Sequence, residues 1–233
     1  MFTSAQDYFE CAGLGTRGER PKVELLVKRR MQRTVNVGVV EHGNSAVLVT
    51  LSSNGEFLDR RRADLTSGLP THPYHHEGAW AVGRYLDSSW ARPISLADAI
   101  ALIERVHEAA AHGAREALEA LAAAVQVPIA SIAIRACPTL PRTIEERIAD
   151  NRAQVVADSV MYRSALAAAA EARGWCVYWY ERARVLPAAA AALGCEDANA
   201  VLNAMGRSIG PPWQARHKLA AAAALAAACQ RVP

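Results

Sequence analysis

Residues 35–65, VNVGVVEHGNSAVLVTLSSNGEFLDRRRADL, decide the fold that we expect for this chain. Three runs suited to β-strands are separated by two turn sequences, HGN at 42–44 and SSNG at 52–55. The Asn-Gly pair in the second turn is a strong indication of a tight hairpin, because both residues adopt a positive φ at little cost. The stretch therefore predicts a three-stranded antiparallel meander.

The residues after the meander alternate between helical and strand patterns. Apolar residues at helical spacing run from Ser95 to Pro128, and a short apolar run follows at 129–136. Another helical segment starts at Thr143, and the aromatic run at 175–180, WCVYWY, predicts a central strand covered on both faces. Because strand-helix-strand connections are normally right-handed and parallel, we expect an α/β fold. Its mixed five-stranded sheet has three antiparallel strands, then two parallel strands, and is flanked by helices.

Composition divides the chain into an arm and a domain. Residues 1–34 contain seven Lys or Arg and four Asp or Glu, so the net charge of +3 lies in this segment. We interpret 1–34 as a basic N-terminal arm and 35–233 as one domain. Within the domain, 66–94 holds three histidines, two tryptophans and two tyrosines without helical periodicity. Such a long connection is usually either functional or an insertion packed on the core.

Composition also excludes several classes of protein. With 52% hydrophobic and 21% charged residues the chain is not expected to be disordered, and its five cysteines form no CxxC pair of a zinc site. The alanine-rich run at 219–229 is too short to span a bilayer, and the N-terminus lacks the apolar segment of a secretory signal. We therefore expect a cytoplasmic protein that has no membrane as a partner. The string GLGTRG at 13–18 follows no predicted strand, and no GxxxxGK[ST] sequence occurs. We therefore expect no nucleotide cofactor.

The predicted order of elements resembles the ribonuclease H-like superfamily, specifically its Holliday-junction-resolvase (RuvC-like) branch. The stretch VNVGVVEHG is similar to that branch's first strand, which ends in an acidic residue and glycine, and SAVLVTLSSNGEFLDRR is similar to its second and third strands. The tail is similar in layout: MYRSALAAAAEARG as a helix, WCVYWY as a strand and HKLAAAAALAAA as the last helix. The resemblance covers 35–229 and implies a ribonuclease H-like sheet.

The resemblance also implies a metal-dependent site. Nucleases of this fold hold two divalent ions, Mg²⁺ or Mn²⁺, with acidic residues on the first strand, the fourth strand and the last helix. Glu41 matches the first of these positions, but Arg135 and Cys137 occupy the region where a fourth-strand carboxylate is expected, and His217 stands on the last helix. The chain is therefore either a catalytically degenerate member that binds nucleic acid or a protein partner, or a divergent metal-dependent nuclease.

The first alternative source of chemistry is the insertion. His75, His76 and Glu77, together with Glu41, could form a mixed imidazole and carboxylate site for Mn²⁺ or Zn²⁺, of which Zn²⁺ fits the resemblance less well. This requires that 71–78 fold back over the carboxyl end of the first strand. The alternative is a polar loop whose imidazoles bond to backbone groups.

The second alternative source is the helix that follows Thr143. Glu146 and Asp150 are four residues apart and share one helical face. These two carboxylates could replace the missing fourth-strand acid, which would make Glu41, Glu146, Asp150 and His217 the catalytic set. The alternative is a capped, solvated helix whose first-turn acids favour the helix dipole.

Basic residues supply the predicted contacts with DNA or RNA. We expect phosphate contacts from Arg60, Arg61 and Arg62 on the third strand and from Arg216 and Lys218 on the last helix. The last helix follows a Gly-Pro-Pro turn, so its N-terminus could also hold an anion. The alternative is a helix whose entry is fixed by Trp213. A protein partner or a homodimer remains open.

Overall fold

The computed structural model describes residues 34–229. The predicted basic arm at 1–34 lies outside the described residues except for Thr34. The meander forms as predicted, with β1 (Val35–His42), β2 (Ser45–Ser52) and β3 (Phe57–Asp64) pairing in antiparallel order.

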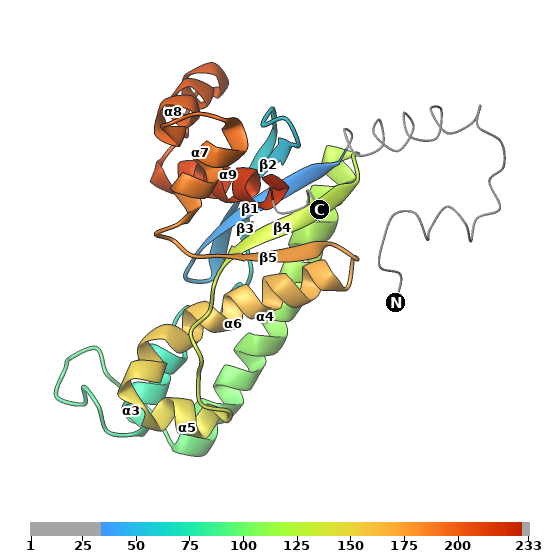
Figure 1. Ribbon diagram of the computed structural model, residues 1–233. Coiled ribbons are helices and arrows are strands. Elements are labelled where there is room, and N and C mark those ends of the chain that lie inside the picture. Colours follow the sequence, from blue (N-terminus) through green and yellow to red (C-terminus); the bar gives the residue numbers. More distant parts are fainter. Residues whose placement is uncertain (1–33, 230–233) are drawn as a thin grey trace, which may run out of the picture.

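Two parallel strands complete the sheet. β4 (Ile129–Arg135) pairs with β1, and β5 (Cys176–Tyr180) pairs with β4, both in parallel. The strand order is β3-β2-β1-β4-β5 (Figure 1). The predicted mixed sheet of three antiparallel and two parallel strands is confirmed, but the prediction that 175–180 is a central strand is wrong. β5 is an edge strand. Tyr180 is buried, but Tyr178 is only partly covered and Trp179 is 42% exposed.

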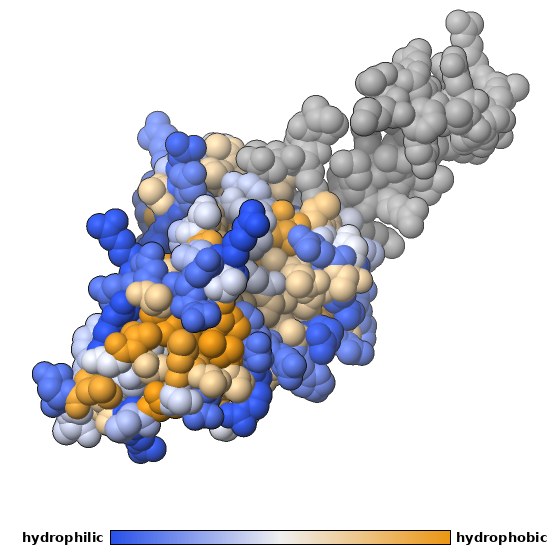
Figure 2. All heavy atoms as spheres, turned by 90° about the horizontal axis from the view of Figure 1, so that it is seen from below, coloured by the Kyte–Doolittle hydropathy of each residue, from blue (hydrophilic) through white to orange (hydrophobic). Residues whose placement is uncertain are grey.

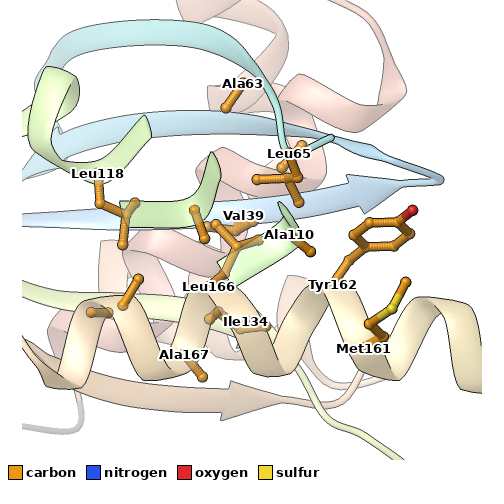
Figure 3. Close-up of a cluster of buried hydrophobic side chains, with 14 of the residues drawn as sticks. Val39, Ala63, Leu65, Ala110, Leu118, Ile134, Met161, Tyr162, Leu166 and Ala167 are labelled. Carbon is orange, nitrogen blue, oxygen red and sulfur yellow. The ribbon is translucent and has the colours of Figure 1, made fainter. Parts of the chain in front are cut away.

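Two long helices cover one face of the sheet. α4 (Leu96–Val125) begins at Ser95, whose side chain accepts a hydrogen bond from the Asp98 N–H and so satisfies one free donor of the first turn. α4 and α6 (Asn151–Glu171) bury their apolar sides against the strands. Figure 3 shows side chains from α4, from α6 and from the strands gathered in this core. The short α5 (Ile144–Ala149) starts in a full capping box formed by Thr143 and Glu146.

The alanine-rich helices cover the opposite face. α9 (Ala215–Cys229) lies directly on the sheet, with α7 (Val185–Leu193) and α8 (Ala198–Ile209) beside it (Figure 1). The approach is close because a Cβ added at Gly38 would lie 1.7 Å from the Ala220 carbonyl oxygen. α9 begins three residues after Pro212, so Pro212 belongs to the preceding turn rather than to the first helical turn.

The insertion at 66–94 contains short helices of its own. They are η1 (Tyr74–Gly78), a π-helix, and α3 (Ala79–Ala81). Tyr74 is fully buried in the core beneath α4 and α6, and the Tyr162 hydroxyl donates to the Thr71 carbonyl at 3.0 Å. The insertion is therefore packed on the core, as its composition predicts.

No single helix among the described residues is long and apolar enough to cross a membrane. α7 and α8 meet the length and composition requirement only as a pair, and that pair is bent by 78°.

Candidate functional site

A hollow of about 280 Å³ lies where the carboxyl ends of the parallel strands meet the start of α9. The parallel arrangement explains this position, because β1, β4 and β5 all end at the same edge of the sheet. We call this the arginine hollow. Its charged or titratable lining residues are Glu41 and His42 of β1, Arg135 of β4, Tyr180 of β5, Arg182 beyond β5 and Arg216 of α9.

The only carboxylate that lines the arginine hollow is already paired. Arg163 of α6 donates from Nη2 to Glu41 Oε1 at 2.6 Å, and from Nη1 to the Ala136 carbonyl at 3.2 Å. The two side chains are 7% and 10% exposed, so the ion pair is buried. Burial lowers the pKa of Arg163, but the hydrogen bond and charge of Glu41, with a further contribution from Cys137, raise that pKa above its ordinary value. Glu41 is therefore held beside a permanent positive charge.

Three other guanidinium groups around the arginine hollow are unpaired. All three, Arg135, Arg182 and Arg216, are exposed to solvent. Within residues 34–229 none of them forms an ion pair. The fold brings them together. Arg135 ends β4, Arg182 follows β5 by two residues, and Arg216 lies at the start of α9. Together with the neutralised Glu41, they make the arginine hollow cationic.

This donor set does not fit a divalent metal pair. Mg²⁺ and Mn²⁺ prefer several carboxylate or carbonyl oxygens, whereas Glu41 is bound to Arg163 and guanidinium groups stand where further acids would be needed. Among the described residues, no group of three or more His, Cys, Asp or Glu side chains is arranged to hold a metal ion.

His217 does not join Glu41. Its Nδ1 accepts a hydrogen bond from the Gln214 N–H at 3.1 Å, and its ring stacks on Trp213 with 5.9 Å between centroids. Burial and the nearby charge of Arg60 lower the pKa of His217. The His217 side chain, stacked on Trp213, therefore helps to fix the start of α9. This agrees with the alternative in which Trp213 fixes the entry of the helix.

Glu146 and Asp150 act as caps and lie away from the arginine hollow. The Glu146 carboxylate accepts from the Thr143 N–H at 2.9 Å, and Asp150 caps α6 by accepting from the N–H groups of Arg152 and Ala153. Those backbone hydrogen bonds lower the pKa of both carboxyls. In Figure 1, α5 lies beyond the end of the sheet, so the structure does not bring these acids to Glu41.

The insertion does return to the carboxyl end of β1, as predicted. A Cβ added at Gly43, next to the end of β1, would lie 2.6 Å from Thr71 Cγ2 and 3.6 Å from His72 Cε1. The predicted ligands, however, are not grouped around Glu41. Among the described residues, His75 Nδ1 and Glu77 Oε2 are buried without a hydrogen-bond partner, and burial lowers the pKa of His75 and raises that of Glu77.

Asp158 of α6 organises the base of the insertion. This buried carboxylate accepts from the N–H groups of Tyr74 and His75 at 2.9 and 3.1 Å, so it caps η1 from a distant helix. Burial raises the pKa of Asp158 to about 7. Nothing near Asp158 in the sequence indicates these partners, because they lie more than 80 residues away.

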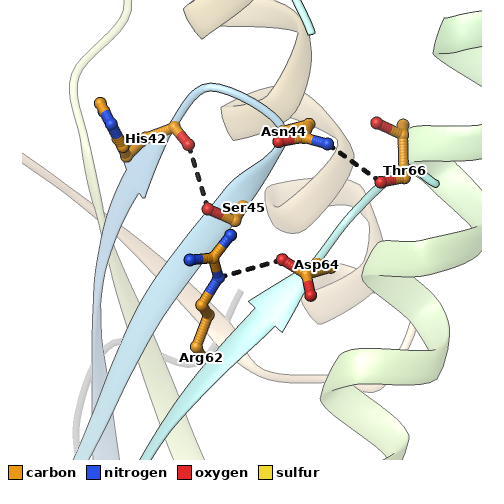
Figure 4. A network of polar contacts seen from close by, with 6 residues as sticks. All are labelled: His42, Asn44, Ser45, Arg62, Asp64 and Thr66. Atoms are coloured by element: carbon orange, nitrogen blue, oxygen red, sulfur yellow. Dashed lines mark hydrogen bonds and ion pairs between the residues drawn. The ribbon is translucent and has the colours of Figure 1, made fainter. Parts of the chain in front are cut away.

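The three arginines of β3 have structural partners. Arg60 donates to the carbonyl groups of Gly210, Pro211 and Pro212, which holds the turn before α9. Arg61 forms a two-point ion pair with Asp59, and Arg62 pairs with Asp64 at 3.0 Å (Figure 4). Lys218 follows Arg216 by two residues, about 200° around the helix, and does not line the arginine hollow. Of the five predicted phosphate ligands, Arg216 alone lines the arginine hollow.

Sequence reasoning missed Arg163 and Arg182 and assigned no role to Arg135. Arg135 and Arg182 could have been found from their places at the ends of parallel strands. Arg163 could not, because it lies 122 residues from Glu41 in an ordinary helical segment.

Comparison with known proteins identifies a likeness of fold. No protein-family model and no curated protein sequence matches the chain. The structure of Thermus thermophilus RuvC in complex with a Holliday junction substrate is 15% identical, with a TM-score of 0.47, and the match covers 85% of this chain and 95% of that one. A second Thermus thermophilus RuvC structure is 15% identical, with a TM-score of 0.44, and the match covers 85% and 96% of the two chains. At this identity the likeness concerns the fold alone.

Proposed function

We infer that this chain binds nucleic acid by its phosphates at the arginine hollow and does not cleave it by two-metal chemistry. The observation that supports this function is the set of unpaired guanidinium groups of Arg135, Arg182 and Arg216 around a carboxylate that Arg163 has neutralised. The protein would then be a non-catalytic relative of the resolvase-like nucleases.

Phosphate is the ligand that this chemistry favours. A guanidinium group stays charged at all working pH values and presents parallel N–H donors that match two phosphate oxygens. The start of α9 lies at the same place, since Ala215 and Arg216 both line the arginine hollow, and free N–H groups at a helix N-terminus also favour an anion. Several such contacts in one hollow suit a polyanion better than a single small anion.

The alternative, a metal-dependent nuclease, has less support. It needs a free carboxylate at Glu41 and further acids beside it, but the neighbouring charged groups are arginines. A protein partner would need to be acidic at the same place, and the experiment below separates it from nucleic acid.

The test is salt-dependent binding of fluorescent single-stranded, duplex and four-way branched DNA and of RNA. Affinity should fall linearly in a plot of log K against log salt concentration. Replacing Arg135, Arg182 and Arg216 together by Gln should reduce the slope by about 2 to 3, because each lost phosphate contact removes about 0.7 to 0.9. Arg105→Gln is the control, since Arg105 is exposed on α4 and does not line the arginine hollow.

Two outcomes would contradict the proposal. The first is an unchanged salt slope in the triple variant that still folds, as judged by its circular dichroism spectrum. The second is cleavage of any of these substrates with Mg²⁺ or Mn²⁺ that Glu41→Gln abolishes. That result would restore the nuclease alternative and place Glu41 in its mechanism.

A further inference from the structure

Four rings of the insertion form one continuous surface. We call His76, Trp80, Tyr85 and Trp90 the aromatic surface. His76 and Trp80 stack with an interplanar angle of 7°, and Trp90 lies 5.7 Å from His76 and 5.8 Å from Tyr85 between ring centroids. Trp90 is 52% and Tyr85 42% exposed. The insertion lies at the lower end of the molecule in Figure 1. Figure 2 views the protein from below and shows an exposed area of aliphatic side chains ringed by hydrophilic ones; its hydropathy colours do not mark Trp, Tyr or His as hydrophobic.

The aromatic surface is held rigidly by the helices beneath it. The Asp158 carboxylate fixes the start of η1 through two backbone N–H groups, and Arg84 hydrogen-bonds to groups on α5 and α6. Tyr85 has a φ of +60°, a conformation that costs a non-glycine residue on the order of 1 kcal/mol. The fold therefore accepts local strain and presents these rings ready to bind.

A chain of neighbouring residues leads from the arginine hollow to the aromatic surface. His42 lines the hollow, and the adjacent Gly43 lies against His72, whose ring is 5.7 Å from that of His76. On α6, Asp158 holds the insertion and Arg163 holds Glu41, five residues or roughly 7.5 Å apart along the helix axis. A polymeric ligand bound at the arginine hollow could therefore extend along this path to the aromatic surface.

We propose that the aromatic surface stacks unpaired nucleobases of a single strand whose phosphates lie at the arginine hollow. This inference rests on the proposed function. It commits to a nucleobase rather than a protein side chain because flat, exposed rings stand next to unpaired guanidinium groups. Proteins that bind single strands combine these two features, a cationic track for the backbone and rings for the bases. Exposed Arg92, two residues after Trp90, adds positive charge at the same place.

The experiment compares three probes on the full chain: a single-stranded oligonucleotide, the same length of duplex, and a single strand with abasic sites in place of its bases. Trp90→Ala should weaken binding of the normal single strand by roughly 5- to 150-fold, the range expected for losing one stacked base. Binding of the duplex and of the abasic strand should be unchanged, and so should the salt slope. Trp90→Phe, which keeps a ring, should recover part of the loss.

Trp179→Ala is the matched control, because Trp179 is another exposed tryptophan, at 42% against 52% for Trp90, and lies on β5 outside the insertion. Equal weakening of the normal and abasic strands by Trp90→Ala would overturn the stacking proposal, and so would no weakening at all. In either case the proposed function still stands if the arginine variants lower the salt slope. Failure of every polynucleotide to bind would overturn both. If Trp90→Ala instead abolished binding of a protein and left all three oligonucleotides unaffected, the aromatic surface would be a protein interface.

Discussion

Removing Arg163 tests the reason why Glu41 is unavailable to a metal ion. Arg163→Met keeps most of the side-chain volume but leaves the Glu41 carboxylate, whose side chain is 10% exposed, without its partner. The Ala136 carbonyl also loses a hydrogen bond of 3.2 Å. We expect a large loss of stability, because an unpaired buried charge is much less stable than the same charge in water.

The expected loss follows from the burial of the pair. Breaking a buried ion pair by removing one partner costs about 3 to 5 kcal/mol in the free energy of unfolding. The double variant Glu41→Gln/Arg163→Met removes both charges, so it should be more stable than Arg163→Met alone. The double-mutant cycle should give a coupling energy of about 2 to 3 kcal/mol, at the upper end for residues in contact.

Urea unfolding followed by circular dichroism measures all four proteins of the cycle. The matched control is Arg184→Met, because Arg184 forms an ion pair of 3.1 Å with Glu181 in which the side chains are 82% and 59% exposed. An exposed pair contributes little, so this control should change the free energy of unfolding by less than about 1 kcal/mol.

A loss below about 1 kcal/mol for Arg163→Met, or a coupling energy near zero, would refute this reasoning. Glu41 would then be free of Arg163 in solution, and the carboxylate would again be a candidate metal ligand.

Three further predictions concern the elements that support the site. Burial raises the pKa of Asp158 from 3.8 to about 7, so the folded protein holds a proton that the unfolded chain releases. This contribution lowers the free energy of unfolding as pH rises from about 4 to 7, by up to about 1.4 kcal/mol per pH unit. Urea titrations at several pH values should show that Asp158→Asn lacks this decrease in stability. The nearby histidines have a lowered pKa and give the opposite slope, but they are present in both proteins. Parallel plots of stability against pH for the two proteins would contradict the prediction. Thr143→Ala should cost about 1 kcal/mol by loss of the capping box, and Thr143→Ser should recover most of this in the same unfolding assay. Gly38→Ala should cost roughly 3 kcal/mol or more in thermal unfolding, because its Cβ would overlap the Ala220 carbonyl and displace α9; a variant with near-normal stability would show that α9 can move away.

Much of the fold was predictable from local sequence. Turn residues set the hairpins of the meander, and the capping residues Ser95 and Thr143 marked the starts of α4 and α5. These features depend on residues within a few positions of one another, so the sequence shows them directly. The order of the parallel strands was less accessible. WCVYWY is apolar enough for a central strand, but among residues 34–229 β5 pairs with β4 alone.

The sequence by itself determined the meander, the alternation of helices and strands, and the local capping of helices, because each depends on neighbouring residues. The tertiary structure decided which charges meet. It pairs Glu41 with Arg163 across 122 residues, makes Asp158 the cap of η1 across more than 80, and places Arg135, Arg182 and Arg216 around one hollow. A carboxylate at the end of a first strand has the same sequence pattern whether a metal ion or a guanidinium group stands beside it. The partner depends on how α6 packs across the sheet, and that packing involves the whole core.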